Sequence, residues 1–139
     1  MFLKYTEKVR VKCNMNLNMA HILSQDSGQP DGWTTSVHCS YYAVFQYMKY
    51  LLAEKAKSPV SYDIQDSHGE DSHKYILEEV KNRIGSIQNA RSIAERVRNL
   101  RQQRVLADYK NKRFDQAESL GCKDEADAII RNLTKLLSA

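Results

Sequence analysis

Apolar residues recur every three or four positions along most of this chain, which is the period of an amphipathic helix. The pattern predicts helices over residues 2–23, 33–55, 72–84, 86–109 and 115–137. The polar segments 24–32 and 58–71 predict loops. Valine, isoleucine and threonine are too scattered for strand patterns of period two, so we expect an all-α protein.

The connections between these helices are short, which predicts an antiparallel bundle of four main helices plus a shorter one. The chain has 139 residues, no internal repeat and no long linker, so residues 1–139 are expected to form one domain. Ser72, Ser86 and Asp115 are candidate N-caps, because their side-chain oxygens can accept from free backbone N–H groups of a first helical turn.

The helix expected over 86–109 carries charges where its apolar face should continue. The apolar stripe consists of Ala90, Ile93, Ala94, Val97 and Leu100. At 100° per residue the same line continues through Arg101, Arg104 and Asp108. Charge on a core-facing line is costly unless it is paired, or unless the face opens onto a cleft or a partner. We therefore expect any functional site to lie here.

Two interpretations of these charges remain open. Arg104 and Asp108 lie four residues apart and can pair on one helix face, as a structural ion pair would. Alternatively, an arginine left without a carboxylate beside a groove can clamp a phosphate, since guanidinium binds such anions in bidentate fashion. Asp108 can neutralise only one of the two arginines, so Arg101 and Arg104 need not share a role.

The net charge is +4, and the basic residues are concentrated in one segment. Only Glu95 and Asp108 oppose the eight basic residues Arg91, Arg96, Arg98, Arg101, Arg104, Lys110, Lys112 and Arg113. Such an excess suits an anionic partner. A solvated helix face is the commoner meaning of a charge run, and it stays open as the alternative.

His38, Tyr41 and Tyr42 lie on or beside the apolar stripe of the helix expected over 33–55. They could line the same cleft as the arginines, or they could be core residues whose polar tips reach partners. His38 is the best candidate for a catalytic base if there is one. The sequence does not decide whether the protein is an enzyme.

No metal or cofactor is expected. Asp66, His68, Glu70, Asp71 and His73 have a metal-like composition, but the spacing of the two histidines matches no zinc pattern. The three cysteines, Cys13, Cys39 and Cys122, form no CxxC pair and are typical of a reducing compartment.

A cytoplasmic location without membrane contact is expected. Residues 1–10 are charged and lack the apolar core of a secretion signal. The most apolar stretch, 41–53, is interrupted by Gln46 and Lys49 and is too short to span a bilayer.

Two segments resemble the HEPN superfamily of small helical bundles. Residues 37–45 (VHCSYYAVF) are similar to the YYA-x-F stretch on the second helix of that family, and residues 100–109 (LRQQRVLADY) are similar to the L-R-x-x-R-x-x-A-D-Y ending of one branch. The resemblance covers about residues 1–137. It implies the HEPN fold, a homodimer and an association with RNA or with nucleotidyltransferase partners, including toxin–antitoxin and defence systems.

The chain departs from the ribonuclease signature of that family. Many HEPN proteins are metal-independent ribonucleases in which an arginine is followed, after four to six residues, by a histidine. Here Asp108 stands at that spacing after Arg101, and the only histidines are His21, His38, His68 and His73. A carboxylate is a poor substitute for imidazole in proton transfer near neutral pH. The resemblance therefore does not carry the ribonuclease activity to this chain.

We expect a non-catalytic HEPN-type module that binds RNA, a nucleotide or a partner protein. In this interpretation Arg101 and Arg104 bind phosphate or an acidic partner, and Asp108 orients one of them. Bordering the cleft are Tyr109, His38 and Tyr42. The alternatives are a metal-independent ribonuclease with an atypical site that uses His38, and a structural subunit of an assembly.

Overall fold

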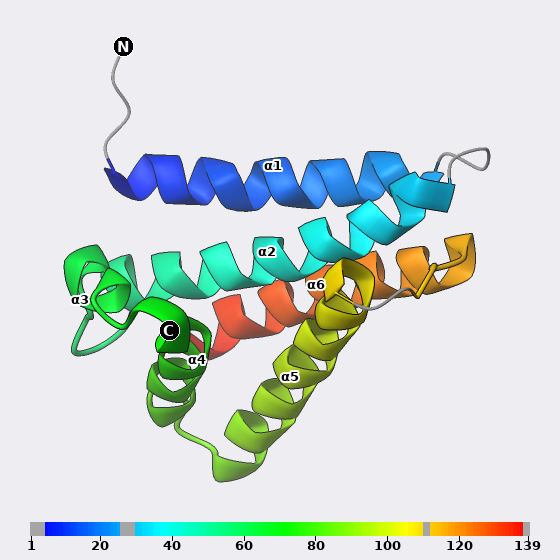
Figure 1. Cartoon of the computed structure of the whole chain (residues 1–139). Helices are drawn as coiled ribbons and strands as arrows, with labels where there is room; N and C mark the ends of the chain where they lie inside the picture. The colour runs from blue at the N-terminus through cyan, green and yellow to red at the C-terminus, as the bar shows by residue number, and fades with distance from the viewer. Residues whose placement is uncertain (1–4, 26–29, 110–111, 138–139) are drawn as a thin grey trace.

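The computed structural model describes residues 5–25, 30–109 and 112–137, and these ranges are almost entirely helical. They contain six α-helices and one 3-10 helix, and no strand (Figure 1). In chain order these are α1 (Tyr5–Gln25), α2 (Pro30–Glu54), α3 (Tyr62–Asp66), η1 (Gly69–Asp71), α4 (Ser72–Asn82), α5 (Ile87–Tyr109) and α6 (Gln116–Leu137). The all-α prediction is confirmed.

Helix α2 lies at the centre and packs against α1, α3, α4, α5 and α6. Figure 1 shows α1 antiparallel to α2 on one side, and α6 alongside α2 in the same direction as α2. Helices α4 and α5 form an inclined pair on the opposite side of α2 from α1. The last turns of α5, which carry Arg104 and Asp108, lie against α2.

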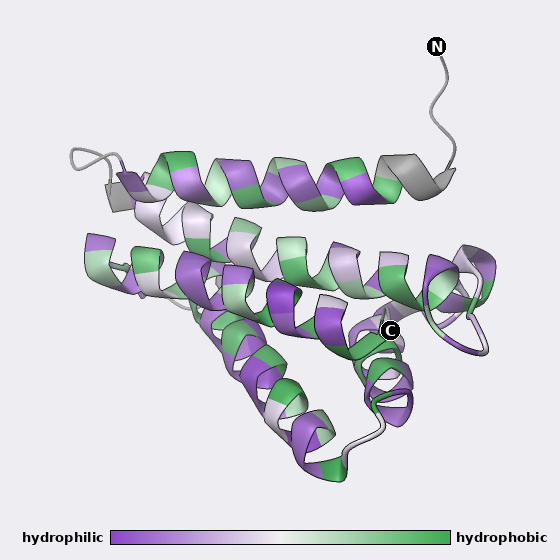
Figure 2. Cartoon of the chain, turned by 180° about the vertical axis from the view of Figure 1, so that it is seen from behind, coloured by the Kyte–Doolittle hydropathy of each residue, from purple (hydrophilic) through white to green (hydrophobic). Residues whose placement is uncertain are grey.

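The predicted apolar stripes form the core. The stripe of α2 is buried at Val37, Tyr41, Val44, Phe45, Met48, Leu51 and Leu52. The five stripe residues of α5, from Ala90 to Leu100, are buried as well. Figure 2 shows apolar and polar residues alternating around each helix, as amphipathic packing requires. Each large apolar side chain that is fully buried contributes about 1.5–3 kcal/mol to stability.

Two of the three predicted caps are confirmed. Ser86 Oγ accepts from the Asn89 N–H at 3.2 Å. Asp115 Oδ1 accepts from the Glu118 N–H at 2.7 Å, and Glu118 Oε1 accepts in return from the Asp115 N–H at 3.1 Å, which forms a capping box. Ser72 is not a cap, because α4 begins at this residue and Asp71 occupies the cap position without a side-chain bond.

The start of one predicted helix and the structure of one predicted loop were wrong. Helix α2 begins at Pro30, three residues before the expected start, because proline is tolerated in a first helical turn where its missing N–H is not needed. The segment 58–71, expected to be a loop, contains α3 and η1. Residues 2–4 of the first expected helix, and 26–29 of the first expected loop, lie outside the described residues.

Side-chain hydrogen bonds hold the polar segment around α3 in place, although Gln65 Oε1 is buried without a partner. Ser61 Oγ accepts from the Ile64 N–H at 3.3 Å and caps α3. Gln65 is fully buried, and its Nε2 donates to the backbone carbonyls of Lys49 and Val60, each at 3.0 Å. These bonds hold α3 against the end of α2. Over the ranges described, no helix has the length and apolarity needed to cross a membrane.

Candidate functional site

Arg104 lies at the contact between the last turns of α5 and the first half of α2. Only 9% of this residue is exposed. Its Nη2 donates to Tyr42 Oη at 2.6 Å, and its Nε lies 3.2 Å from Asp108 Oδ2, within ion-pair distance. The Nε–H is not aligned for a hydrogen bond to that oxygen, so the contact with Asp108 is electrostatic.

Three aromatic rings surround the Arg104 guanidinium. Its central carbon lies 5.1 Å from the ring centre of Tyr42, 5.5 Å from that of Tyr109 and 5.8 Å from that of Tyr41. Burial alone would lower the pKa of Arg104, but the hydrogen bond to Tyr42 and the charges nearby outweigh it, and the pKa is raised. Arg104 is therefore a permanent cation held by Tyr42 and Asp108, although its Nε has no hydrogen-bond partner.

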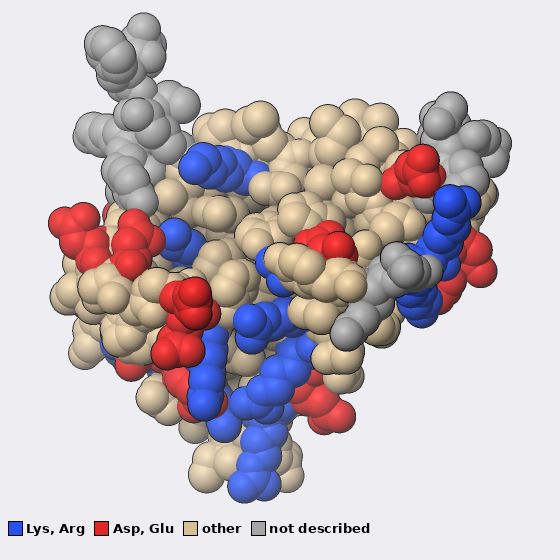
Figure 3. Space-filling model, in the orientation of Figure 1, with Lys and Arg blue, Asp and Glu red and all other residues tan. Residues whose placement is uncertain are grey.

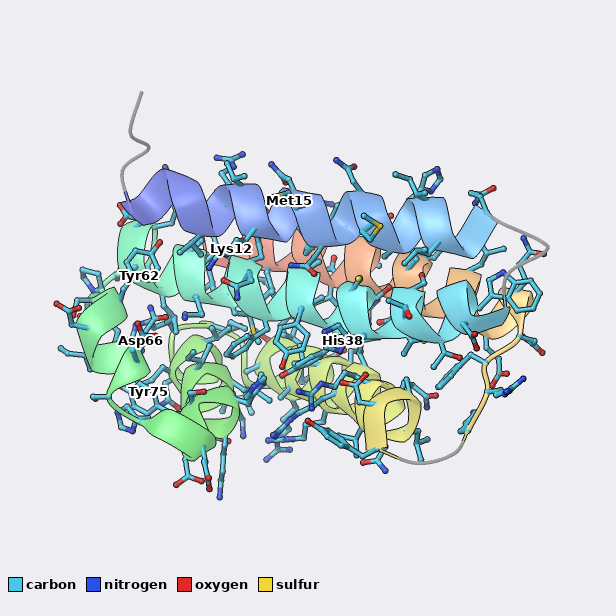
Figure 4. All side chains as sticks on the ribbon, turned by 45° about the horizontal axis from the view of Figure 1, so that its top comes forward. Lys12, Met15, His38, Tyr62, Asp66 and Tyr75 are labelled. Carbon is cyan, nitrogen blue, oxygen red and sulfur yellow. The ribbon has the colours of Figure 1, made fainter. Side chains whose placement is uncertain are left out.

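Asp108 is shared between Arg104 and His38. His38 Nδ1 lies 2.7 Å from Asp108 Oδ2, across 70 residues of sequence. The His38 side chain is 41% exposed and that of Asp108 is 21% exposed. Figure 4 shows His38 between α2 and α5, and its ring lies 4.6 Å from the ring of Tyr42. The structure thus brings together five predicted site residues: His38, Tyr42, Arg104, Asp108 and Tyr109.

Arg101, the sixth predicted residue, has a different environment. Its Nε is buried and has no hydrogen-bond partner. Within the described ranges, Arg101 forms no ion pair. It lines a cavity of about 230 Å³ between α4 and α5, together with Tyr41, His73, Lys74, Leu77, Glu78, Val97 and Arg98. The Nε atoms of both arginines of the LRxxR motif are buried without a hydrogen-bond partner, but Arg104 forms a hydrogen bond and an ion pair through its guanidinium, whereas Arg101 forms neither with the described residues.

A neutral pair forms one wall of this cavity. The Tyr41 hydroxyl lies 2.6 Å from His73 Nδ1. Burial, and then the charges of Arg101 and Arg104, lower the pKa of His73 to about 4. Burial raises the pKa of Tyr41. At neutral pH the imidazole is therefore uncharged and the phenol protonated, and the hydroxyl can donate to Nδ1.

Sequence reasoning missed His73 as a site residue, because it was grouped with a metal-like acidic segment. The structure disperses that group. Asp66 pairs with Lys49 at 3.1 Å, the His68 ring stacks on Tyr75 at 3.5 Å, and His73 turns toward Tyr41. The available signal was helical spacing, since residue 73 shares the face of the buried Leu77 and Val80.

No metal-binding arrangement occurs in the part of the chain that is described, where no three His, Cys, Asp or Glu side chains lie together. The three cysteines are free and buried. Burial raises the pKa of Cys13 to about 12 and that of Cys122 to about 11, so these thiols are protonated at neutral pH.

Acidic residues from other helices neutralise much of the basic run. Arg96 pairs with Glu125 at 2.5 Å, Lys112 with Glu118 at 2.9 Å and Arg98 with Glu78 at 3.5 Å. Lys110 lies outside the described residues. Figure 3 shows a group of Lys and Arg side chains over the region of α4 and α5, with acidic side chains at its border. At the cavity itself, three cations, Lys74, Arg98 and Arg101, face the one carboxylate of Glu78.

No protein-family model, curated protein or solved structure matches this chain. The function must therefore be inferred from the site itself, in which Arg104 is held by Tyr42 and Asp108 and Arg101 lines a cationic cavity.

Proposed function

We propose that this chain is a non-catalytic HEPN-type helical module that binds a phosphate-bearing ligand, RNA or a nucleotide, through Arg101. One observation carries the proposal: Arg101 lines a cavity with an excess of positive charge and, unlike Arg104, forms no hydrogen bond or ion pair with a described residue. A bound phosphate would give the Arg101 guanidinium a partner, because guanidinium and phosphate form charge-assisted hydrogen bonds.

The roles of the two arginines separate in this proposal. Arg104 is fixed by Tyr42 and Asp108, so it joins α5 to α2 and shapes the wall of the site. Asp108 orients Arg104 and His38. Arg101 is the group left to contact the ligand.

The contact between the two HEPN-like segments supports the family resemblance. Residues 37–45 lie on α2 and residues 100–109 lie on α5, far apart in the chain. They meet through the bonds Tyr42–Arg104 and His38–Asp108. Two motifs that form one interface are expected to be kept together in a family.

The test is binding of a fluorescein-labelled single-stranded RNA, followed by anisotropy at low and moderate salt without added metal. The wild-type chain should bind, and more weakly as salt rises, because phosphate contacts release counterions. Arg101→Gln should lose at least about tenfold in affinity, whereas Arg91→Gln, an exposed arginine on the same helix, should change it by less than about twofold. Equal losses in the two variants would contradict a specific role for Arg101.

The same RNA, run afterwards on a denaturing gel, separates binding from catalysis. We expect intact RNA. Cleavage that His38→Ala abolishes would replace the binding proposal with the ribonuclease alternative, in which Asp108 would hold His38 through Nδ1.

A second candidate function, assembly with a protein partner, is favoured by α1. Its outer face exposes four large apolar residues, Val11, Met15, Met19 and Ile22, at spacings of four, four and three. Met15 is 62% exposed and is labelled on α1 in Figure 4. A continuous apolar stripe on a surface helix suits a partner helix, either from a second copy or from a nucleotidyltransferase.

Light scattering over a wide concentration range tests this candidate. If the apolar face of α1 joins two copies, the wild-type chain is a dimer and Met15→Glu shifts it toward the monomer. A monomeric wild-type chain at all concentrations would exclude the homodimer.

A further inference from the structure

We propose that the cavity at Arg101 receives a terminal phosphate, a phosphomonoester at the end of an RNA or on a free nucleotide, rather than a diester within a strand. This inference rests on the proposed function, because it uses the same arginine. It specifies which phosphate group of a nucleic acid or nucleotide binds at the site.

The shape of the cavity suits a phosphate at the end of an RNA chain better than a phosphate within the chain. Three residues of its lining are buried core side chains: Tyr41 of α2 at 1% exposure, Leu77 of α4 at 7% and Val97 of α5 at 2%. Because these residues belong to the core, the cavity is closed on its inner side. A diester has a sugar on both sides of the phosphate, so its chain must enter and leave. A monoester needs only one opening.

The volume supports the same conclusion. The cavity has a volume of about 230 Å³, which is room for several water molecules. This space suits one phosphate group and part of the attached sugar, which the apolar side chains of Leu77 and Val97 can contact.

The charge of the cavity favours a dianion. Lys74, Arg98 and Arg101 line it, and the single opposing carboxylate, Glu78, is already 3.5 Å from Arg98. A phosphomonoester carries about −1.5 to −2 charge at pH 7, whereas a diester carries one negative charge. Since the cations attract the additional charge, the monoester should bind more tightly.

The neutral wall of the cavity adds hydrogen-bonding capacity without negative charge. With Tyr41 donating to His73 Nδ1, the imidazole proton resides on Nε2, which makes that nitrogen a donor. No described residue accepts a hydrogen bond from it. A neutral donor beside three cations is compatible with an anion at this position.

The experiment compares three forms of one eight-nucleotide RNA, fluorescein-labelled at the end that is not varied: 5′-phosphate, 3′-phosphate and unphosphorylated. Anisotropy should show a form with a terminal phosphate binding at least about tenfold more tightly than the unphosphorylated RNA, which corresponds to about 1.4 kcal/mol. Arg101→Gln should abolish this preference and Lys74→Gln should reduce it. Arg91→Gln should retain it.

Competition with AMP and adenosine separates the two sources of a terminal phosphate. Displacement of the RNA by micromolar AMP, but not by adenosine, identifies a free nucleotide as a sufficient ligand. Competition only by phosphorylated RNA assigns the site to RNA ends. Either result supports the proposal.

Other results would overturn it. Equal Arg101-dependent binding of phosphorylated and unphosphorylated RNA would refute the terminal-phosphate inference and leave the proposed function standing. No binding of any RNA or of AMP would refute both. Thermal unfolding of each variant, followed by circular dichroism, shows that a loss of binding is not a loss of fold. Arg101→Lys keeps the charge without the two-pronged geometry, so it should retain part of the preference.

Discussion

Arg104 of α5 donates a hydrogen bond to the Tyr42 hydroxyl of α2 over 2.6 Å, between residues 62 positions apart in the chain. This bond explains why a charge can follow an apolar stripe into the protein. The guanidinium enters a site that already holds an acceptor, a carboxylate and three aromatic rings. The last turns of α5 therefore depend on polar contacts where its earlier turns depend on apolar ones.

Replacement of Arg104 should destabilise the protein, whereas replacement of Arg101 should not. Arg104→Ala leaves Asp108 and the Tyr42 hydroxyl without their cation, at a cost of about 2–4 kcal/mol. Arg101→Ala removes a group without a partner and should change stability by less than about 1 kcal/mol. Urea unfolding followed by circular dichroism measures both. Similar losses in the two variants would contradict the separation of their roles.

Tyr42→Phe should isolate the hydrogen bond from the stacking. The ring remains under the guanidinium, but Nη2 loses its acceptor, so the free energy of unfolding should fall by about 1.5–3 kcal/mol. Tyr109→Phe is the matched control. Tyr109 is 70% exposed, and its hydroxyl forms no hydrogen bond with the residues described. Tyr109→Phe should therefore change the free energy of unfolding by less than about 0.5 kcal/mol.

His73 should make the fold sensitive to acid. Its pKa in the folded protein is about 4, below the usual value of 6.5, so the unfolded chain binds a proton more readily. Stability should be constant with respect to this group above pH 6.5 and should decrease as the pH falls toward 4. Between pH 7 and pH 5 the loss should be about 1–2 kcal/mol, allowing for solvent around a half-buried ring.

Urea unfolding at the two pH values tests this expectation in variants. His73→Phe retains the stacking on Phe45 but cannot bind a proton. The variant should be less stable than the wild type at pH 7, but it should lose less stability between pH 7 and pH 5. His21→Asn removes an exposed histidine and should leave the loss unchanged. An unchanged loss in His73→Phe would show that other groups cause it.

Gln65→Leu should destabilise the protein although it adds apolar volume. The substitution leaves the carbonyls of Lys49 and Val60 without their donor inside the protein. We expect a loss of about 2–4 kcal/mol in the free energy of unfolding. Gln88→Leu, at an exposed position of α5, should change it by less than about 0.5 kcal/mol. A neutral Gln65→Leu would contradict this expectation and would indicate that removal of the buried, unpartnered Oε1 offsets the two lost bonds.

The helices could be predicted from the sequence, and so could the charged residues that interrupt the apolar face of α5, because both depend on spacing along the chain. The buried positions from Ala90 to Leu100 follow the 3.6-residue period, and the next residues on that line are charged in the sequence itself. The pairing of Arg104 with Asp108 follows from the same spacing, since both lie on one helix.

The remaining features depend on contacts between distant segments. Helix α3 has too few apolar residues for its pattern to be detected, and it is held by bonds from Gln65 to carbonyls elsewhere. His73 belongs to the site only because α4 brings it to Tyr41 of α2. Arg96 is paired only because α6 brings Glu125 beside it. Spacing along one helix carries no information about which side chain of another helix lies opposite.

The central position of α2 has a consequence for how the protein opens. Five helices pack on α2, so its backbone amides can meet solvent only when most of the fold is lost. In hydrogen–deuterium exchange, the middle of α2 should therefore be protected to nearly the full free energy of unfolding. The bond from Tyr42 to Arg104 extends that protection to the last turns of α5, where helix ends ordinarily fray.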